Sequence, residues 1–560
     1  MHDLARTRQI PPRTSPAPTI DWISCRSKSS TEITMHCCRL LTVFRHFGTG
    51  ANSGNGLAFR RLTNVGKNSV AFRYSRGYSS ACSASTNYGR CSTSSRGGRI
   101  FAPARYLSRC TPSWTGSQDS DKPTGSILEL QPNDFVDFLK EKKIRRCFVV
   151  YDSRAGEVRV SHPELEELVR FSREDRVDYD NHEAVFLEVG ARSGCLLGAF
   201  VWRTNRGQAC GGIRLWDYAN MEQYLRDGLR LAQGMGVKSA LAGLWVGGGV
   251  SVVCEPRERL SLLSDLRASL MADCGCFLSD LNGCLVAAED VGLNVIDLDN
   301  VHMFSRYTTC ISEDKGGSGN PSVATGKGVI CAMEGALDFL HMGTLEGKRI
   351  GIQGAGNVST IVVEELLKKN VSHIYVTDCH MNRVTDMRNR FPGVTDILQV
   401  EKVPLDDNGV LAYPCDIISP CALGNILNAD TIPTINAKIV CGAANNQLGS
   451  PEDNLLLKER GITYIVDYLA NRMGIVNCAN ETYGRLPDDP AINRHFGREW
   501  DNSIFLMTKK MLKKAQSEDI TPVEAANAIA DKLSLELHPI WPQRSQQIIQ
   551  ALVDNNWHLG

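Results

Sequence analysis

The chain reads GKRIGIQGAGNVS over residues 347–359 and VSHIYVTD over residues 371–378, and these two stretches decide the fold of this region. The apolar run 349–353 predicts a short strand that ends at Gly354, and the apolar spacing after Gly356 predicts a helix. A second strand then ends at Asp378. The order strand, loop, helix, strand is typical of a βαβ unit in a parallel sheet.

The glycine loop has the chemistry of a pyrophosphate site. Gly354 permits a tight turn, and Gly356 allows backbone N–H groups to approach the phosphates. The helix that begins with Asn357 and Val358 presents the positive end of its dipole to the same phosphates. Asp378 stands where a carboxylate accepts hydrogen bonds from the adenosine ribose and repels a 2′-phosphate. The unit therefore predicts NAD, rather than NADP, as the cofactor.

The flanking sequence extends this pattern. Residues 345–480 alternate strand-like runs with helical segments, which predicts a parallel sheet. Short apolar runs between 127 and 214 also predict strands, and Asn220 is expected to cap a helix. Thr521-Pro522-Val523-Glu524 combines an N-cap, a proline at the first helical position and a capping-box glutamate, so it predicts another helix start.

The N-terminal region differs in composition from the remainder. Residues 1–110 contain 15 Arg and 2 Lys but only three acidic residues. This composition predicts a mitochondrial transit peptide over residues 1–78, cleaved after Tyr78, and a location in the mitochondrial matrix. Residues 79–125 are rich in Ser, Gly, Arg and Thr and predict a disordered linker. The alternative is a basic arm that binds nucleic acid, but no recognition module or interleaved aromatic pattern accompanies it, so we expect no such partner.

Cysteine spacing and hydropathy exclude other classes of protein. Fourteen of the 20 cysteines follow residue 110, and they form neither a CxxC pair nor a metal-binding spacing. We therefore predict no metal site, and we expect reduced thiols that are mostly buried. No run of 18 uncharged apolar residues occurs, which argues against a spanning helix and a membrane partner.

Several further motifs occur in a fixed order before and after the glycine loop. They are Gly211-Gly212-Ile213-Arg214, Met235-Gly236-Val237-Lys238, Gly247-Gly248-Gly249-Val250, Glu289-Asp290-Val291-Gly292, Gly319-Asn320-Pro321-Ser322 and Ser419-Pro420-Cys421-Ala422-Leu423-Gly424. Together they resemble the leucine dehydrogenase-like branch of the Glu/Leu/Phe/Val amino-acid dehydrogenase family. The resemblance covers about residues 127–560.

This resemblance implies an α/β fold of two domains with a cleft between them. A substrate domain of the dimerisation type is expected over 126–320, and a Rossmann-like doubly wound NAD-binding domain over 321–483. C-terminal helices over 484–560 are expected to pack back on the first domain. The family generally assembles into homo-oligomers, so we expect the same here.

The resemblance also implies a reaction and the residues that perform it. The family transfers a hydride from the α-carbon of an amino acid to NAD, and hydrolysis of the resulting imine gives a 2-oxo acid and ammonia. Lys238 matches the lysine that pairs with the substrate carboxylate. Asp290 matches the acid that exchanges protons with the amino group. Gly211, Gly212 and Met235 match positions on the substrate side.

Other matching positions belong to the cofactor half. Thr325 and Asn446 match residues that hold the nicotinamide end, and Asn446 also borders the substrate. Ala422 and Leu423 match residues that line the adenosine end of the cofactor site. Asn471 and Asn477 match further residues near the cleft.

The chain departs from the family pattern at the position of the catalytic base. Val250 stands where the third glycine motif ends in a lysine that activates water, and valine cannot take a proton. Loss of a general base typically lowers the rate ~10²–10⁴-fold. Lys327 is a weaker candidate for a substitute base. The alternative to an active enzyme is therefore a catalytically impaired NAD-binding protein with a sensing or assembly role.

A second departure lies where the family has Ala-Gly beside the substrate side chain. Arg472 and Met473 occupy these positions, and they are expected to crowd the pocket. Arg472 cannot act as a base, but it is a candidate to bind a second carboxylate of the substrate or to fill the vacated cation site. Cys210 likewise replaces an apolar pocket residue.

Overall fold

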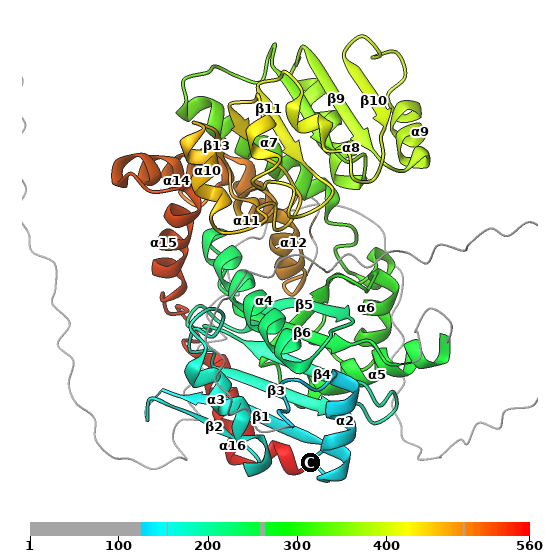
Figure 1. The fold of residues 1–560 in the computed structure, drawn as a ribbon, viewed down its shortest axis with the longest axis vertical. Helices are drawn as coiled ribbons and strands as arrows, with labels where there is room; N and C mark the ends of the chain where they lie inside the picture. The colour runs from blue at the N-terminus through cyan, green and yellow to red at the C-terminus, as the bar shows by residue number, and fades with distance from the viewer. Residues whose placement is uncertain (1–124, 154, 258–263, 485, 487) are drawn as a thin grey trace, which may run out of the picture. The chain divides into compact units, whose positions relative to one another are not determined.

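The computed structural model describes residues 125–560, except 154, 258–263, 485 and 487 (Figure 1). The predicted transit peptide and all but the last residue of the predicted linker lie outside the described residues. In the described part, no helix combines the length and hydropathy that crossing a bilayer requires.

The first sheet has seven strands in the order β2-β1-β3-β4-β6-β5-β7. Pairing is antiparallel from β2 through to β6, whereas β5 runs parallel to both β6 and β7. The strands are β1 (Arg146–Asp152), β2 (Glu157–Val160), β3 (Ala184–Val189), β4 (Leu196–Val201), β5 (Ala209–Trp216), β6 (Gly247–Cys254) and β7 (Leu285–Glu289).

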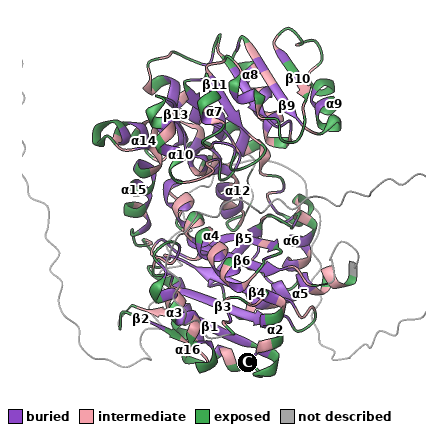
Figure 2. Ribbon diagram, viewed as in Figure 1, coloured by how far each residue is buried: buried purple, intermediate pink, exposed green. Residues whose placement is uncertain are grey.

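Helices cover both faces of this sheet, because its strands send alternate side chains to opposite sides. Along β3, Val185 and Leu187 enter the core beneath α2, α3 and α4, whereas Phe186 enters the core beneath α5, α6 and α16. Figure 2 shows the strands as buried and the outer helix surfaces as exposed. The helices are α2 (Pro132–Glu141), α3 (Glu166–Glu174), α4 (Met221–Leu241), α5 (Ser264–Asp280), α6 (Val295–His302) and α16 (Arg544–Asp554).

The second sheet is parallel, with six strands in the order β10-β9-β8-β11-β12-β13. The first strand, β8, has β9 on one side and β11 on the other, so the strand order reverses there, as in a doubly wound nucleotide-binding sheet. The predicted α/β fold class is confirmed. The strands are β8 (Arg349–Gln353), β9 (His373–Asp378), β10 (Leu398–Lys402), β11 (Ile417–Pro420), β12 (Ile439–Val440) and β13 (Thr463–Tyr464).

The helices around the second sheet begin and end as follows. They are α7 (Ser322–Phe339), α8 (Asn357–Lys368), α9 (Met381–Arg390), α10 (Asp453–Glu459), α11 (Asp467–Ala470) and α12 (Met473–Glu481). Short 3₁₀ turns lie at Pro163–Leu165, Glu313–Lys315, Gly409–Ala412, Ile432–Thr434, Arg494–Phe496 and Trp557–Leu559.

The C-terminal helices pack against elements of both sheets. They are α13 (Pro490–Asn493), α14 (Ile504–Glu518), α15 (Pro522–Ser534) and α16. Helix α14 packs on α7, and α15 packs on α4. The Thr521 hydroxyl and the Glu524 carboxylate form the predicted capping box at the start of α15. Helix α16 places Ile548, Ile549 and Leu552 in the core of the first sheet.

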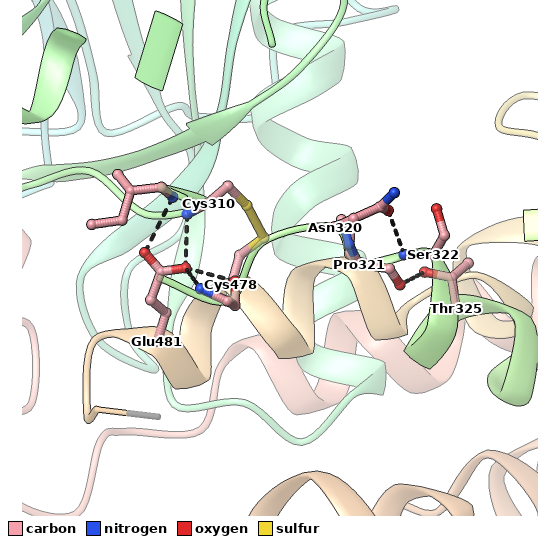
Figure 3. The surroundings of a disulfide bond; sticks show 9 residues. Cys310, Asn320, Pro321, Ser322, Thr325, Cys478 and Glu481 are labelled. Carbon is pink, nitrogen blue, oxygen red and sulfur yellow. Dashed lines mark hydrogen bonds between the residues drawn. A yellow bond between two sulfur atoms is a disulfide. The ribbon is translucent and has the colours of Figure 1, made fainter. Parts of the chain in front are cut away.

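A disulfide joins Cys310, in the segment that leads to α7, to Cys478 on α12 (Figure 3). The two Cα atoms lie 5.5 Å apart although the residues are 168 positions apart in sequence. The Glu481 carboxylate accepts hydrogen bonds from the backbone N–H groups of Cys310 and Ser318, at 3.0 and 2.8 Å. This pair corrects the expectation that all cysteines are reduced. The other cysteines in the described residues form no disulfide with one another.

Candidate active site

The glycine loop between β8 and α8 has the geometry of a phosphate cradle. Gly354 has φ of 95°, which a residue with a Cβ rarely adopts. A Cβ on Gly354 would lie 2.8 Å from that of Ala422, so the glycine allows β8 and the segment after β11 to approach each other. Around Gly356, by contrast, a Cβ would meet no atom within 4 Å. The loop therefore leaves open space at the start of α8, as the phosphates of a dinucleotide require.

Asp378 ends the neighbouring strand, and the glycine loop holds it in place. Its carboxylate accepts hydrogen bonds from the backbone N–H groups of Ala355, at 2.8 Å, and His380, at 2.7 Å. Burial of Asp378 would raise its pKa, but these hydrogen bonds outweigh burial and hold the pKa below its ordinary value. The carboxylate is therefore ionised at neutral pH.

A polar network joins α4 of the first domain to the loop after β12. The Lys238 ammonium lies 3.5 Å from Asn445 Oδ1, which also accepts a hydrogen bond of 2.7 Å from the Asn471 amide. The next residue, Asn446, has φ of 52° and donates its backbone N–H to Asp467 at 2.8 Å. Lys238, Asn446 and Asn471, which the sequence assigned to one cleft, therefore belong to connected parts of the structure.

Burial shifts the pKa values of two groups near this network in opposite directions. It lowers the pKa of Lys238, although the negative charges of Asp467 and Asp290 oppose the shift. It raises the pKa of Asp467, although Lys238 and the Asn446 N–H oppose that shift. Each of the two charges thus favours the charged form of the other, and burial opposes both.

Asp290 follows β7 and is held by an arginine. Arg214 Nε donates to Asp290 Oδ2 at 3.1 Å, while the same guanidinium pairs with Asp227 at 3.2 Å. The Tyr218 hydroxyl donates to Asp227 at 2.6 Å. The Asp290 side chain is 27% exposed, so the network fixes its direction and leaves it accessible.

The glycine motifs of the first domain make close packing possible around Asp290. A Cβ on Gly212 would lie 2.4 Å from the Asp290 Cβ. A Cβ on Gly211 would lie 1.7 Å from the Gly249 carbonyl oxygen and 3.3 Å from Met235 Cγ. These distances show that Gly211 and Gly212 are needed for the approach of β5 to its neighbours.

Val250 is a core residue. It lies on β6 opposite Phe200, is 1% exposed and packs in the core beneath α4. It carries no titratable atom. Lys327, considered as a substitute base, is exposed on α7.

The predicted substrate role of Arg472 is not supported by its position. Its side chain is fully buried, and its guanidinium donates to the carbonyl oxygens of Leu241, at 2.6 Å, and Asn502. Arg472 therefore binds the C-terminal end of α4 instead of a substrate carboxylate. Met473 is also fully buried, in the core around the second sheet, and its effect on the substrate pocket stays a prediction.

Some of the remaining predicted positions lie at the surface beside the glycine loop, and the others are buried. Asn357 and Leu423 are exposed, and Val358 is half-buried at the start of α8, beside the glycine loop. Thr325 is buried on α7, and its hydroxyl donates to Pro321 O at 3.0 Å. Cys210 is buried, which raises its thiol pKa to about 12 and keeps it neutral.

Sequence reasoning gave no role to Arg214, Asp227 or Asp467. Asp467 follows the parallel strand β13, and side chains at the carboxyl ends of parallel strands commonly bind ligands. That signal was present in the sequence. The pairing of Arg214 with Asp227 and Asp290 depends on the packing of α4 against the sheet and has no sequence signal.

A glycine loop at the reversal point of a parallel sheet, with a lysine and an aspartate on a second α/β domain, defines a two-domain oxidoreductase of the Rossmann type. Comparison with known proteins specifies the family. Residues 316–536 match the model described as Glutamate/Leucine/Phenylalanine/Valine dehydrogenase, and residues 198–308 match the Glu/Leu/Phe/Val dehydrogenase, dimerisation domain. The chain belongs to this family and is an amino-acid dehydrogenase.

Individual relatives agree with this assignment. The chain is 35% identical to leucine dehydrogenase from Geobacillus stearothermophilus over 63% of this chain and 90% of that enzyme. It is also 35% identical to valine dehydrogenase from Streptomyces coelicolor over 65% of this chain and 94% of that enzyme. The structure of L-tryptophan dehydrogenase from Nostoc punctiforme matches with a TM-score of 0.53 and 26% identity, covering 65% of this chain and 97% of that one.

Proposed function

We propose that the chain catalyses NAD-dependent oxidative deamination of an L-amino acid to a 2-oxo acid and ammonia, or the reverse reaction. The observation that carries this proposal is the contact of Lys238, from the first domain, with Asn445 beside Asn446 in the second. This contact brings the residue expected to bind the substrate carboxylate to the residue expected to bind the nicotinamide.

Each group in this arrangement has a separate task. The Lys238 ammonium binds the substrate carboxylate, and Asp290, oriented by Arg214, exchanges a proton with the amino nitrogen. The open space at Gly356 fits the cofactor phosphates, and Asn446 borders the nicotinamide end. When bound, NAD accepts the hydride from the α-carbon.

Steady-state kinetics with branched, aromatic and acidic amino acids test this function through NADH absorbance. Lys238→Met is expected to raise KM for the amino acid ~10–100-fold, because a charge-assisted hydrogen bond is lost. Lys510→Met removes an exposed lysine from α14 and serves as the matched control, with kcat and KM unchanged. Absence of turnover with every amino acid, in a chain that binds NADH, would refute the proposal.

Val250 supports a second candidate, the catalytically impaired NAD-binding protein with a sensing or assembly role. The core position of this side chain offers no proton acceptor where the family places a base. NADH binding without turnover supports this candidate. In that case Val250→Lys is expected to restore measurable deamination, because Arg472 and Met473 are packed into the protein interior. A wild-type chain with ordinary turnover excludes it.

We also propose a mitochondrial matrix location and a homo-oligomer. The basic, acid-poor composition of residues 1–78 supports the first, and the match of residues 198–308 to a dimerisation domain supports the second. A fusion of residues 1–78 to a fluorescent protein tests import, and failure to enter the matrix would refute the targeting role. Light scattering of the purified chain tests oligomerisation, for which a monomeric mass at micromolar concentration is the contrary result.

A further inference from the structure

A buried arginine lies where the end of α4 meets the start of α12. The Arg472 side chain is fully buried, and its guanidinium donates to the backbone carbonyls of Leu241, at 2.6 Å, and Asn502. Arg472 Nη2 also lies 3.3 Å from His495 Nδ1. Among the described residues, Arg472 forms no ion pair with a carboxylate, and its Nε has no hydrogen-bond partner. Neutral acceptors alone therefore hold this cation.

The charge of Arg472 is unfavourable to bury. Burial lowers the pKa of Arg472 to about 9, which leaves the guanidinium charged at neutral pH. A charge in the interior without a counter-charge disfavours folding, and a neutral side chain at this position would avoid that penalty. Stability alone therefore does not account for an arginine here.

The guanidinium contacts the last turn of α4, the helix that carries Lys238. Leu241 is the final residue of this helix, and a helix leaves its last carbonyl groups without an intrahelical partner. These carbonyls form the negative end of the helix dipole, which a nearby cation stabilises. Lys238 lies three residues earlier, and its carbonyl accepts the Ala242 N–H at 3.0 Å. Arg472 therefore fixes the stretch of backbone from which the Lys238 side chain extends.

The residue before Arg472 contacts the network at the other end of the same lysine. The Asn471 amide donates to Asn445 Oδ1 at 2.7 Å, and the Lys238 ammonium lies 3.5 Å from that oxygen. Helix α4 packs against α11 and α12, the two helices that flank Asn471 and Arg472 (Figure 1). A lysine has a flexible four-carbon stem, so the place of its ammonium depends on where its backbone is held.

We propose that Arg472 is a positioning residue for the substrate carboxylate, because it fixes the last turn of α4 so that the Lys238 ammonium lies beside Asn445. The inference rests on the proposed function, in which Lys238 binds that carboxylate. The buried guanidinium of Arg472 acts through Lys238 and does not contact the substrate. Misplacement of a binding group by about 1 Å can lower a rate ~10²-fold, so removal of the guanidinium should have a measurable effect.

Binding of 2-oxo acids to the complex of the full chain with NADH measures this effect without turnover, because the reverse reaction needs ammonia and the buffer contains none. Branched, aromatic and acidic 2-oxo acids are titrated, and the change in NADH fluorescence gives the Kd of the one that binds most tightly. The Kd of NADH alone is measured in the same way.

Two variants of Arg472 separate its charge from its geometry. Arg472→Met removes the charge, whereas Arg472→Lys keeps the charge and loses the planar fork of donors. We expect the Kd of the 2-oxo acid to rise ~10-fold in Arg472→Met and ~3-fold in Arg472→Lys, with the Kd of NADH changed less than ~2-fold. Arg498→Met removes an exposed arginine from the segment before α14, and as the matched control it should leave both Kd values unchanged.

A double-mutant cycle with Lys238 distinguishes positioning from general support of the fold. If Arg472 acts through Lys238, Arg472→Met should change the Kd of the 2-oxo acid less than ~2-fold in a chain that carries Lys238→Met. If Arg472→Met does not fold, the same cycle is measured with Arg472→Lys.

An equal loss of 2-oxo acid affinity with and without Lys238 would overturn the positioning role. An unchanged Kd in both Arg472 variants, or equal weakening of NADH and the 2-oxo acid, would overturn it as well. These outcomes leave the proposed function standing. A wild-type chain that binds no 2-oxo acid in the presence of NADH would instead overturn the proposed function, and the positioning role with it.

Discussion

Removal of the Cys310–Cys478 disulfide is expected to destabilise the chain strongly. The bond closes a loop of 168 residues in sequence. In the chain-entropy model, a cross-link over a loop of this length lowers the entropy of the unfolded chain enough to stabilise the fold by ~5 kcal/mol at 25 °C. Measured values for such bonds are commonly smaller, so we expect a loss of about 3–5 kcal/mol in the double variant Cys310→Ser/Cys478→Ser.

Urea unfolding followed by tryptophan fluorescence measures this loss. The matched control is Cys276→Ser/Cys379→Ser, which replaces two half-buried free thiols and is expected to change the unfolding free energy by less than ~1 kcal/mol. A dithiol reductant should lower the stability of the wild type toward that of the Cys310/Cys478 variant and leave the variant unchanged. The contacts of Glu481 remain in the variant, so its NADH affinity should be retained.

Equal stability of the wild type and the variant without reductant would refute this reasoning. A mass spectrum of the native chain that shows Cys310 and Cys478 as free thiols would do so as well.

Three further predictions concern packing, pH and the cofactor loop. Gly211→Ala should cost ~2 kcal/mol or more of unfolding free energy, because its Cβ would lie 1.7 Å from a carbonyl oxygen of β6; Gly234→Ala on α4, where a Cβ meets nothing within 4 Å, should be neutral or stabilising. Burial lowers the pKa of His182 to about 4, so the folded chain resists a proton that the unfolded chain binds below its ordinary pKa of 6.5. The free energy of unfolding should therefore decrease by ~2 kcal/mol as the pH is lowered from 7 to 5. His182→Gln should make the urea midpoint less dependent on pH in this range. An unchanged dependence in the variant would contradict the role given to His182. Gly356→Val should weaken NADH binding at least ~100-fold in a fluorescence titration, because its side chain fills the space for the phosphates, and retained affinity would place the cofactor elsewhere.

The sequence predicted the local parts of this structure because short-range physics decides them. The apolar run 349–353 located β8 at its observed bounds. Asn220 caps α4 through a hydrogen bond to the Gln223 backbone N–H, as its side chain and position require. The glycine loop at Gly354 also followed from sequence, since a positive φ and an open phosphate approach demand glycine.

Only the tertiary structure decided how distant residues act on one another. The sequence indicated the cofactor loop, the family and the individual residues Lys238 and Asp290. It did not show that Cys310 pairs with Cys478, because no spacing rule connects residues 168 positions apart. Nor did it show that Arg472 is buried against the C-terminal end of α4. Whether a cationic side chain contacts solvent, a substrate or a backbone carbonyl depends on which helices pack around it. Local pattern specifies elements and motifs, whereas burial and charge pairing depend on side chains that folding alone brings together.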